Sequence, residues 1–185
     1  ENLEKKIMNK IINPTLKALK ELGTDYKGFL YAGLMIIDHE PYLIEYNVRM
    51  GDPECQTILP KLKTDLCEIF LSCCEKKLKE IDIKWSEKKS LCIVLCSEGY
   101  PENFKKNILI ENIDKIIIDQ DNLCYHAGTN ISNDGIIATS GRVLNFISLS
   151  NNFLDAKVSI IKNLEKLNWS GGFYRKDIGY KVIDL

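Results

Sequence analysis

The stretch IEYNVRMGDPE, residues 44–54, begins with the pattern of a β-strand and ends with that of a turn. Glu45, Asn47 and Arg49 are spaced two apart, so they share one face of any strand that continues as far as Arg49. Carboxylate and amide oxygens suit Mg²⁺ together with phosphate oxygens, and a guanidinium suits a phosphate or a carboxylate. The pattern predicts a metal–polyphosphate site beside a second anionic substrate, although the same spacing is also typical of a solvated strand face.

The residues on either side of this stretch predict a hairpin and a helix. The segment 28–37, GFLYAGLMII, is apolar at both alternating sets of positions, which predicts a largely buried strand. DHEP predicts a tight connection to the returning strand YLIEYNV, giving an antiparallel pair. In GDPE, Asp52 can cap a helix whose first helical position is Pro53, and that helix should stop near Pro60.

The remaining segments divide into two predicted parts. Residues 1–78 hold an N-terminal helix interrupted by Pro14 and capped by Gly23, the hairpin, and a helix opened by Thr64 or Asp65. Residues 79–185 hold several strands, among them 115–119, and a helix near 151–167 with Phe153, Val158, Ile161 and Leu164 facing inward. The expected fold class is α+β.

Composition limits the kinds of partner. The chain has 185 residues, a net charge of −1 and 45% hydrophobic residues, so it has no global basic field for nucleic acid or an anionic membrane. Its apolar runs are too short to cross a bilayer, and no signal-peptide pattern is present. Seven cysteines without a C-x-x-C pair disfavour structural zinc and indicate free thiols in a reducing cytoplasm.

Several motifs together resemble one enzyme family. IEYNVRMGDPECQ is similar to the signature E-[FY]-N-x-R-x-G-D-P-E-x-Q of the phosphoribosylamine–glycine ligases, members of the ATP-grasp superfamily. Further matching motifs follow in the order of that family: YKGFLYAGLMI before the signature, then GYP, HAGT, GRVL and FYRKDIG after it. The resemblance implies the C-terminal part of an ATP-grasp domain, residues 1–78, followed by a small mixed α/β C-terminal ligase domain, residues 79–185.

The resemblance also implies roles for residues of the opening stretch. Glu45 and Asn47 match ligands of Mg²⁺ or Mn²⁺ that bridge the phosphates of ATP. Arg49 matches a catalytic position that stabilises the transferring phosphoryl group, and Asp52 matches a position at the substrate end of the cleft, where it could meet an amine or cap the helix. Met50 departs from the family pattern, and segment 28–37 carries no acidic residue that could supply a second metal ligand.

A second candidate site lies in RKDIG. By the resemblance, Arg175 and Lys176 clamp the 5-phosphate of the ribose and Asp177 orients them. The alternative is a surface turn with an Arg–Asp pair. A lone histidine, His126 in YHAGT, is more often a hydrogen-bonded structural residue than a catalytic one, and His39 is expected to be exposed.

The implied activity joins glycine to 5-phosphoribosylamine with ATP, through a glycyl phosphate, in purine biosynthesis. The chain starts without Met, and neither G-x-x-x-x-G-K-[ST] nor G-x-G-x-x-G occurs in it. We therefore expect a piece of a longer monomeric enzyme, whose upstream part is its partner and without which it is inactive. Two alternatives stay open: another ATP-grasp carboxylate–amine ligase, and a non-catalytic interaction module.

Overall fold

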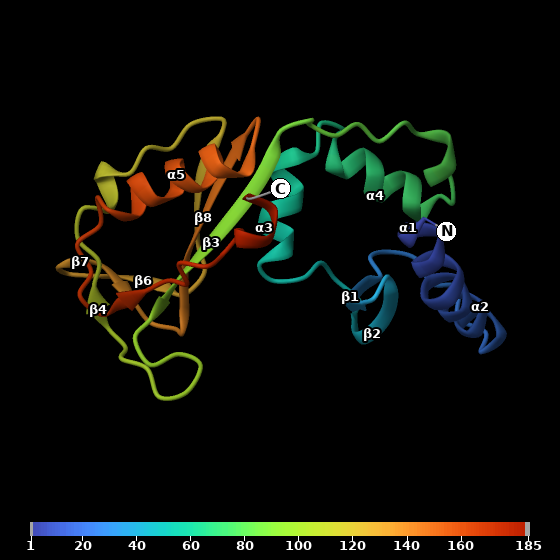
Figure 1. The fold of residues 1–185 in the computed structure, drawn as a ribbon, viewed down its shortest axis with the longest axis horizontal. Coiled ribbons are helices and arrows are strands. Elements are labelled where there is room, and N and C mark those ends of the chain that lie inside the picture. The colour runs from blue at the N-terminus through green and yellow to red at the C-terminus, as the bar shows by residue number, and fades with distance from the viewer. Residues whose placement is uncertain (1, 184–185) are drawn as a thin grey trace. The chain divides into compact units, whose positions relative to one another are not determined.

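The computed structural model describes residues 2–183 (Figure 1). The chain forms two compact units: a first unit of Glu1–Asp52 with Thr64–Lys84, and a second unit of Pro53–Lys63 with Trp85–Leu185. A domain boundary at residue 79 stays a prediction. Among residues 2–183, no helix has the length and apolar content needed to cross a bilayer.

The first unit opens with a helical segment that changes its winding before a proline. α1 (Leu3–Ile7) leads into a π-helical turn, η1 (Met8–Ile12), and then into α2 (Asn13–Glu21) with Pro14 in its first turn. A proline has no N–H for the ladder, so the interruption predicted here is confirmed. Gly23 adopts φ +80° and its N–H donates to Lys20 O, which confirms the predicted C-terminal cap.

The predicted antiparallel hairpin is confirmed. β1 (Tyr31–Ile37) pairs with β2 (Glu40–Asn47) through a two-residue turn in which Asp38 and His39 both have positive φ. The predicted burial of the first strand is wrong, because Met35, Ile36 and Ile37 are 52%, 41% and 54% exposed. β1 belongs to a sheet of only two strands, which leaves apolar side chains of the hairpin uncovered.

Polar contacts fasten this hairpin to the N-terminal helical segment. The Tyr46 hydroxyl lies 2.6 Å from Thr15 Oγ1, on the strand face opposite Glu45 and Asn47. At the hairpin turn, Lys6 and Lys10 both donate to the Glu40 carboxylate. Those hydrogen bonds hold the pKa of Glu40 down to about 2. The strand that carries the candidate site is therefore anchored at both ends.

The rest of the first unit is helical. α4 (Leu66–Cys74) is capped by Asp65, one of the two predicted candidates, whose Oδ1 accepts from the Cys67 and Glu68 N–H groups at 2.8 and 3.0 Å. A short 3₁₀ turn, η3 (Leu78–Glu80), follows.

The second unit is built on two antiparallel sheets. The larger sheet has the order β5-β8-β3-β9, and the smaller has the order β4-β7-β6. Their strands are β3 (Lys89–Ser97), β4 (Ile108–Leu109), β5 (Asn122–His126), β6 (Thr129–Ser132), β7 (Gly135–Ala138), β8 (Arg142–Ser150) and β9 (Gly172–Phe173). The turn between β6 and β7 is the predicted SNDG turn.

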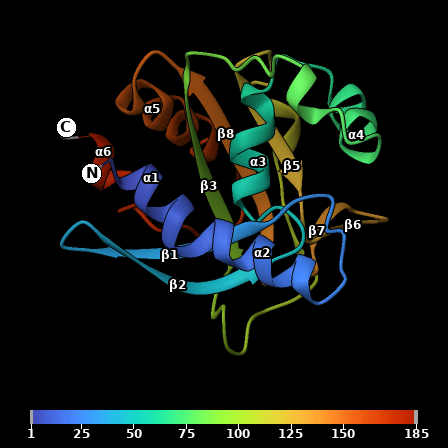
Figure 2. The ribbon, with the colours of Figure 1, turned by 90° about the vertical axis from the view of Figure 1, so that its right-hand side faces the viewer.

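Helices cover both faces of the larger sheet (Figure 2). α5 (Phe153–Leu164) lies on one face and α3 (Glu54–Ile58), continued by η2 (Leu59–Lys61), on the other. The core between α5 and the sheet is apolar, with Ile93, Phe146 and Ile160 at most 1% exposed. Two short elements complete the unit, η4 (Ile113–Lys115) and α6 (Tyr180–Ile183). The arrangement confirms the α+β class.

Three local predictions differ from the structure. Residues 116–119 form no strand, because the backbone of Ile117 is hydrogen-bonded at both N–H and C=O to the Asn163 side chain of α5. Val158 is 41% exposed, and Ala156 takes the inward position instead. Pro53, and not the predicted Asp52, is the N-cap residue of α3, so Pro53 is not its first helical residue and no side chain caps this helix.

The Glu40 contacts predict a pH dependence of stability. A carboxylate whose folded-state pKa is depressed stabilises the fold above its ordinary pKa of 4.5, and this stabilisation is lost as the pH falls toward about 2. We expect an NMR titration of the Glu40 carboxyl to give a midpoint near 2. Glu40→Gln should lower the thermal midpoint at neutral pH, and the difference from wild type should vanish in acid.

The control is Glu87→Gln, since Glu87 is exposed. A Glu40 carboxyl that titrates at its ordinary value would show that the two lysines do not hold it in solution.

Candidate functional site

The centre of the candidate site is a pair of side chains on β2. Glu45 and Asn47 alternate on the strand and share one face, as predicted, and Asn47 Nδ2 donates to Glu45 Oε1 at 3.0 Å. Their cross-strand partners on β1 are Gly33 and Tyr31, respectively. The hairpin register therefore puts a carboxylate and an amide side by side.

Gly33 makes room for the Glu45 side chain. A Cβ added at Gly33 would lie 3.0 Å from Glu45 Cγ, closer than ordinary packing allows. The pairing register also shifts between Gly33 and Leu34, so Ile44 is an extra residue on β2 just before Glu45. A bulge of this kind re-aims the neighbouring side chain, and here that side chain is the proposed metal ligand.

Arg49 does not share this face, because the strand does not continue as far as Arg49. β2 ends at Asn47, and Arg49 lies in the bend that follows, where Nη1 donates to Met50 O at 2.9 Å. The chain turns there toward the buried Gly51 and the exposed Asp52. Only the carboxylate and the amide of the predicted trio share the strand.

The donor atoms of the pair fit a hard cation. Asn47 uses Nδ2 toward Glu45, which leaves its carbonyl Oδ1 for another partner. A carboxylate with one amide oxygen is a partial ligand set for Mg²⁺, which usually takes its other ligands from phosphates and water. Among residues 2–183, no three or more His, Cys, Asp or Glu side chains group as a metal site.

The RKDIG segment carries an exposed ion pair in the second unit. Arg175 donates to both oxygens of Asp177, from Nε at 3.1 Å and from Nη2 at 2.6 Å. This contact raises the pKa of Arg175 and lowers the pKa of Asp177. This geometry is that of the predicted alternative, a surface turn with an Arg–Asp pair, and the orienting role of Asp177 stays a prediction.

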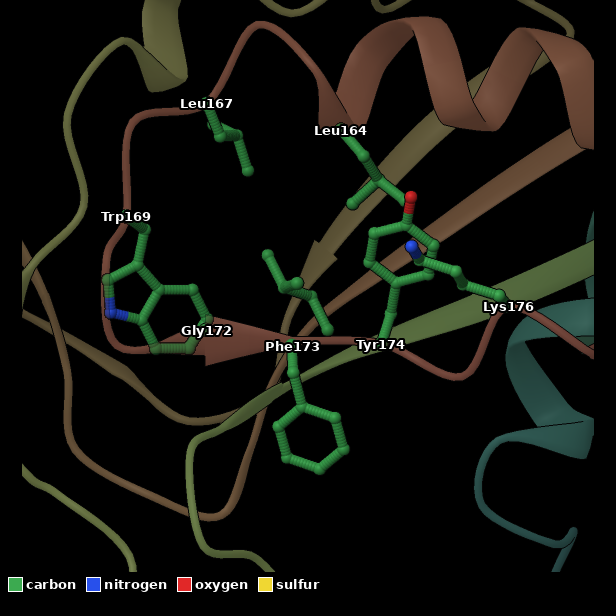
Figure 3. Close-up of a pocket in the computed structure, with 8 residues that line it drawn as sticks. Leu164, Leu167, Trp169, Gly172, Phe173, Tyr174 and Lys176 are labelled. Atoms are coloured by element: carbon green, nitrogen blue, oxygen red, sulfur yellow. The ribbon is translucent and has the colours of Figure 1, made fainter.

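Arg175 and Lys176 line different cavities. Lys176 lines a cavity of about 300 Å³ with Trp169, Phe173 and Tyr174 (Figure 3). Arg175 lines a separate cavity of about 350 Å³, together with Tyr100, Pro101, Cys96 and other residues of the second unit. The two cations do not converge on one cavity here, and their joint role as a phosphate clamp stays a prediction.

The sequence analysis did not predict that the GYP, HAGT and GRVL motifs lie next to one another in the structure. Ser97 N–H donates to Gly141 O, and a Cβ at Gly141 would lie 2.1 Å from the Tyr100 ring. A Cβ at Gly128 would lie 2.3 Å from the Ser140 side chain. The GYP, HAGT and GRVL motifs therefore interlock at one end of the larger sheet, beside the Arg175 cavity. Motif order along the chain carries no signal of this juxtaposition.

The histidines and cysteines have structural surroundings. His126 Nδ1 lies 2.8 Å from Thr129 Oγ1, which agrees with the structural interpretation, and His39 is exposed in the hairpin turn. All seven cysteines are free thiols. Burial raises the pKa of Cys124 to about 12 and also raises the pKa of Cys96, so these two thiols stay protonated and act as packing groups.

Comparisons with known proteins agree along the chain. Residues 1–55 match the model of the phosphoribosylglycinamide synthetase ATP-grasp (A) domain, and residues 90–181 match that of the phosphoribosylglycinamide synthetase C domain. A phosphoribosylamine–glycine ligase of Caldanaerobacter subterraneus subsp. tengcongensis is 39% identical over 96% of this chain and 43% of that protein. A chloroplastic one of Arabidopsis thaliana is 35% identical over 99% of this chain and 35% of that protein.

A solved structure gives the same result. The crystal structure of phosphoribosylamine–glycine ligase from Thermotoga maritima superposes with a TM-score of 0.73 at 29% identity, over 95% of this chain and 42% of that one. The chain thus spans about two fifths of the length of such relatives. It belongs to the phosphoribosylglycinamide synthetase family, in which it corresponds to the end of the ATP-grasp (A) domain and the C domain.

Proposed function

We propose that this chain is the C-terminal half of an ATP-dependent ligase of purine biosynthesis. The whole enzyme joins glycine to 5-phosphoribosylamine through a glycyl phosphate and releases glycinamide ribonucleotide, ADP and phosphate. The observation that carries the proposal is the Glu45–Asn47 oxygen pair, which lies inside the segment matched to the ATP-grasp domain. ATP is a substrate of this reaction and Mg²⁺ or Mn²⁺ its metal.

In this proposal Glu45 and Asn47 hold the metal against the ATP phosphates. When bound, the metal neutralises charge that develops as the phosphoryl group moves. Arg49 adds a fixed positive fork beside them. Its present hydrogen bond to Met50 O is a single contact, worth about 0.5–1.5 kcal/mol net. That cost is small compared with a charge-assisted contact to a transferring phosphoryl group, so Arg49 can be recruited from the bend.

The second unit supplies the proposed binding groups for phosphoribosylamine. Arg175 already presents its planar fork to a carboxylate, which is the geometry that also suits a phosphate. The Asp177 pair is exposed and solvent-screened, so a dianionic phosphate can replace it. Lys176 offers a second cation next to it in sequence, and Asp52 a carboxylate for the substrate amine.

The two alternatives differ from this proposal in what they bind. Another ATP-grasp carboxylate–amine ligase would share Glu45 and Asn47 but take a different acid and amine. The matches to both an A domain and a C domain of one synthetase favour glycine and phosphoribosylamine. A non-catalytic module would use the polar face of β2 without any nucleotide.

The free thiols support a cytoplasmic location, and a monomeric state stays a prediction.

The first test compares the chain alone with a longer protein that adds the remaining length of its relatives. We expect the longer protein to form ADP only when glycine and phosphoribosylamine are both present, and we expect other amino acids to be poor substitutes. The chain alone should be inactive, because a glycyl phosphate needs a closed, water-free cleft. Glycinamide ribonucleotide formation by the chain alone would contradict this account, and ADP release with another amino acid would favour the related ligase.

The second test removes one charge from the proposed metal site of the longer protein. Glu45→Gln keeps the shape of the side chain but weakens its hold on a divalent cation, so kcat/KM should fall on the order of 10²-fold or more. Glu68→Gln on α4 is the matched control, since Glu68 is exposed and outside the hairpin. Equal activity of the two variants would contradict the proposed role of Glu45 as a metal ligand.

A further inference from the structure

A third cavity in the second unit is separate from the two that Lys176 and Arg175 line. It measures about 320 Å³, which is within the size range of sites for small ligands, roughly 300–1,000 Å³. Its walls come from α3 and η2, from β3, from the start of α5 and from the segment that enters β3. The lining residues are Thr57, Ile58, Lys61, Trp85, Lys89, Ser90 and Phe153.

Two lysines give this cavity a positive charge. Among residues 2–183, neither Lys61 nor Lys89 lies within ion-pair distance of a carboxylate. The neighbouring Lys88 is different, since its ammonium donates to both oxygens of Asp121. The cavity thus presents two uncompensated cations, an arrangement that attracts a small anion.

A buried hydroxyl on the cavity wall lacks a partner. Ser90 is only 9% exposed, and its Oγ is buried without a hydrogen bond to any residue in the range 2–183. Buried hydroxyl groups are normally hydrogen-bonded, so an orphan of this kind calls for a missing partner. A ligand oxygen held between the two lysines would supply one after a small side-chain adjustment.

The remaining walls are aromatic and apolar. Trp85 is 45% exposed and lines the cavity with Phe153 and Ile58. An exposed indole face is a natural platform for a planar ring. Trp85 is also held in place, because its neighbour Ser86 donates to Lys61 O at 2.7 Å and Trp85 itself bridges to Leu62.

We propose that this cavity binds a small phosphate monoester that also carries a planar ring, such as a nucleoside monophosphate. The phosphate contacts Lys61, Lys89 and the Ser90 hydroxyl, and the ring lies against Trp85. The site is distinct from the Glu45–Asn47 pair and does not depend on the ligase assignment.

The test uses fluorine-labelled tryptophan in the 185-residue chain. The chain has two tryptophans, so Trp85 reports on this cavity and Trp169, which lines another, serves as an internal reference. Adenosine monophosphate should move the Trp85 fluorine resonance saturably, with a Kd on the order of 1 mM or tighter, and leave Trp169 unmoved. Adenosine and ribose 5-phosphate, which each lack one recognition element, should bind more weakly.

The variants remove the charge and the hydroxyl separately. Lys61→Met with Lys89→Met should weaken adenosine monophosphate at least about tenfold, and Ser90→Ala should weaken it severalfold. Lys63→Met with Lys84→Met is the matched control, because both lysines are exposed and neither lines the cavity; it should bind like wild type. The proposal is overturned if Trp85 does not respond, if adenosine binds as tightly as the monophosphate, or if the control and test pairs weaken binding equally.

Discussion

The pairing register of the β1–β2 hairpin is the constraint on which the candidate site depends. The two-residue turn at Asp38 and His39 and the bulge after Gly33 together set which residues face each other. They put Glu45 opposite the one residue, a glycine, that leaves room for it. A slip of one position would move Glu45 and Asn47 to the other face. Tyr46, bonded to the helical segment on that other face, resists such a slip.

In the second unit, the constraint is a rigid sheet that holds the loops at its ends. Its core between α5 and the sheet is built mainly from buried apolar side chains, and it holds β3 and β8 in place. Three glycine-containing motifs interlock at one such end because only glycine permits the contacts they make. The cavity that Arg175 lines is built on this framework.

Much of this could be predicted from the sequence, and the failures have physical causes. The hairpin, the Pro14 interruption and the Asp65 cap follow from local rules that tertiary contacts did not override. Residues 115–119 look like a strand by composition, but an Asn163 side chain takes the hydrogen bonds of Ile117. Arg49 lies outside β2 because the strand ends at Asn47, and the spacing of polar residues does not show where a strand ends. The apolar pattern of β1 predicted a buried strand, but its last three residues are largely exposed. Such a pattern shows that a strand can pack against a core, and it does not show whether this chain supplies the element that covers it.

The most direct test of the central claim is a paramagnetic measurement on the longer protein with Mn²⁺ and a non-hydrolysable ATP analogue. The side-chain amide signal of Asn47, assigned by its loss in Asn47→Leu, should broaden beyond detection when the metal–nucleotide complex binds. Addition of Mg²⁺ in excess should restore it. An Asn47 amide that keeps its line width at saturating Mn²⁺ and nucleotide would contradict the assignment of the Glu45–Asn47 pair as the metal-binding centre of this chain.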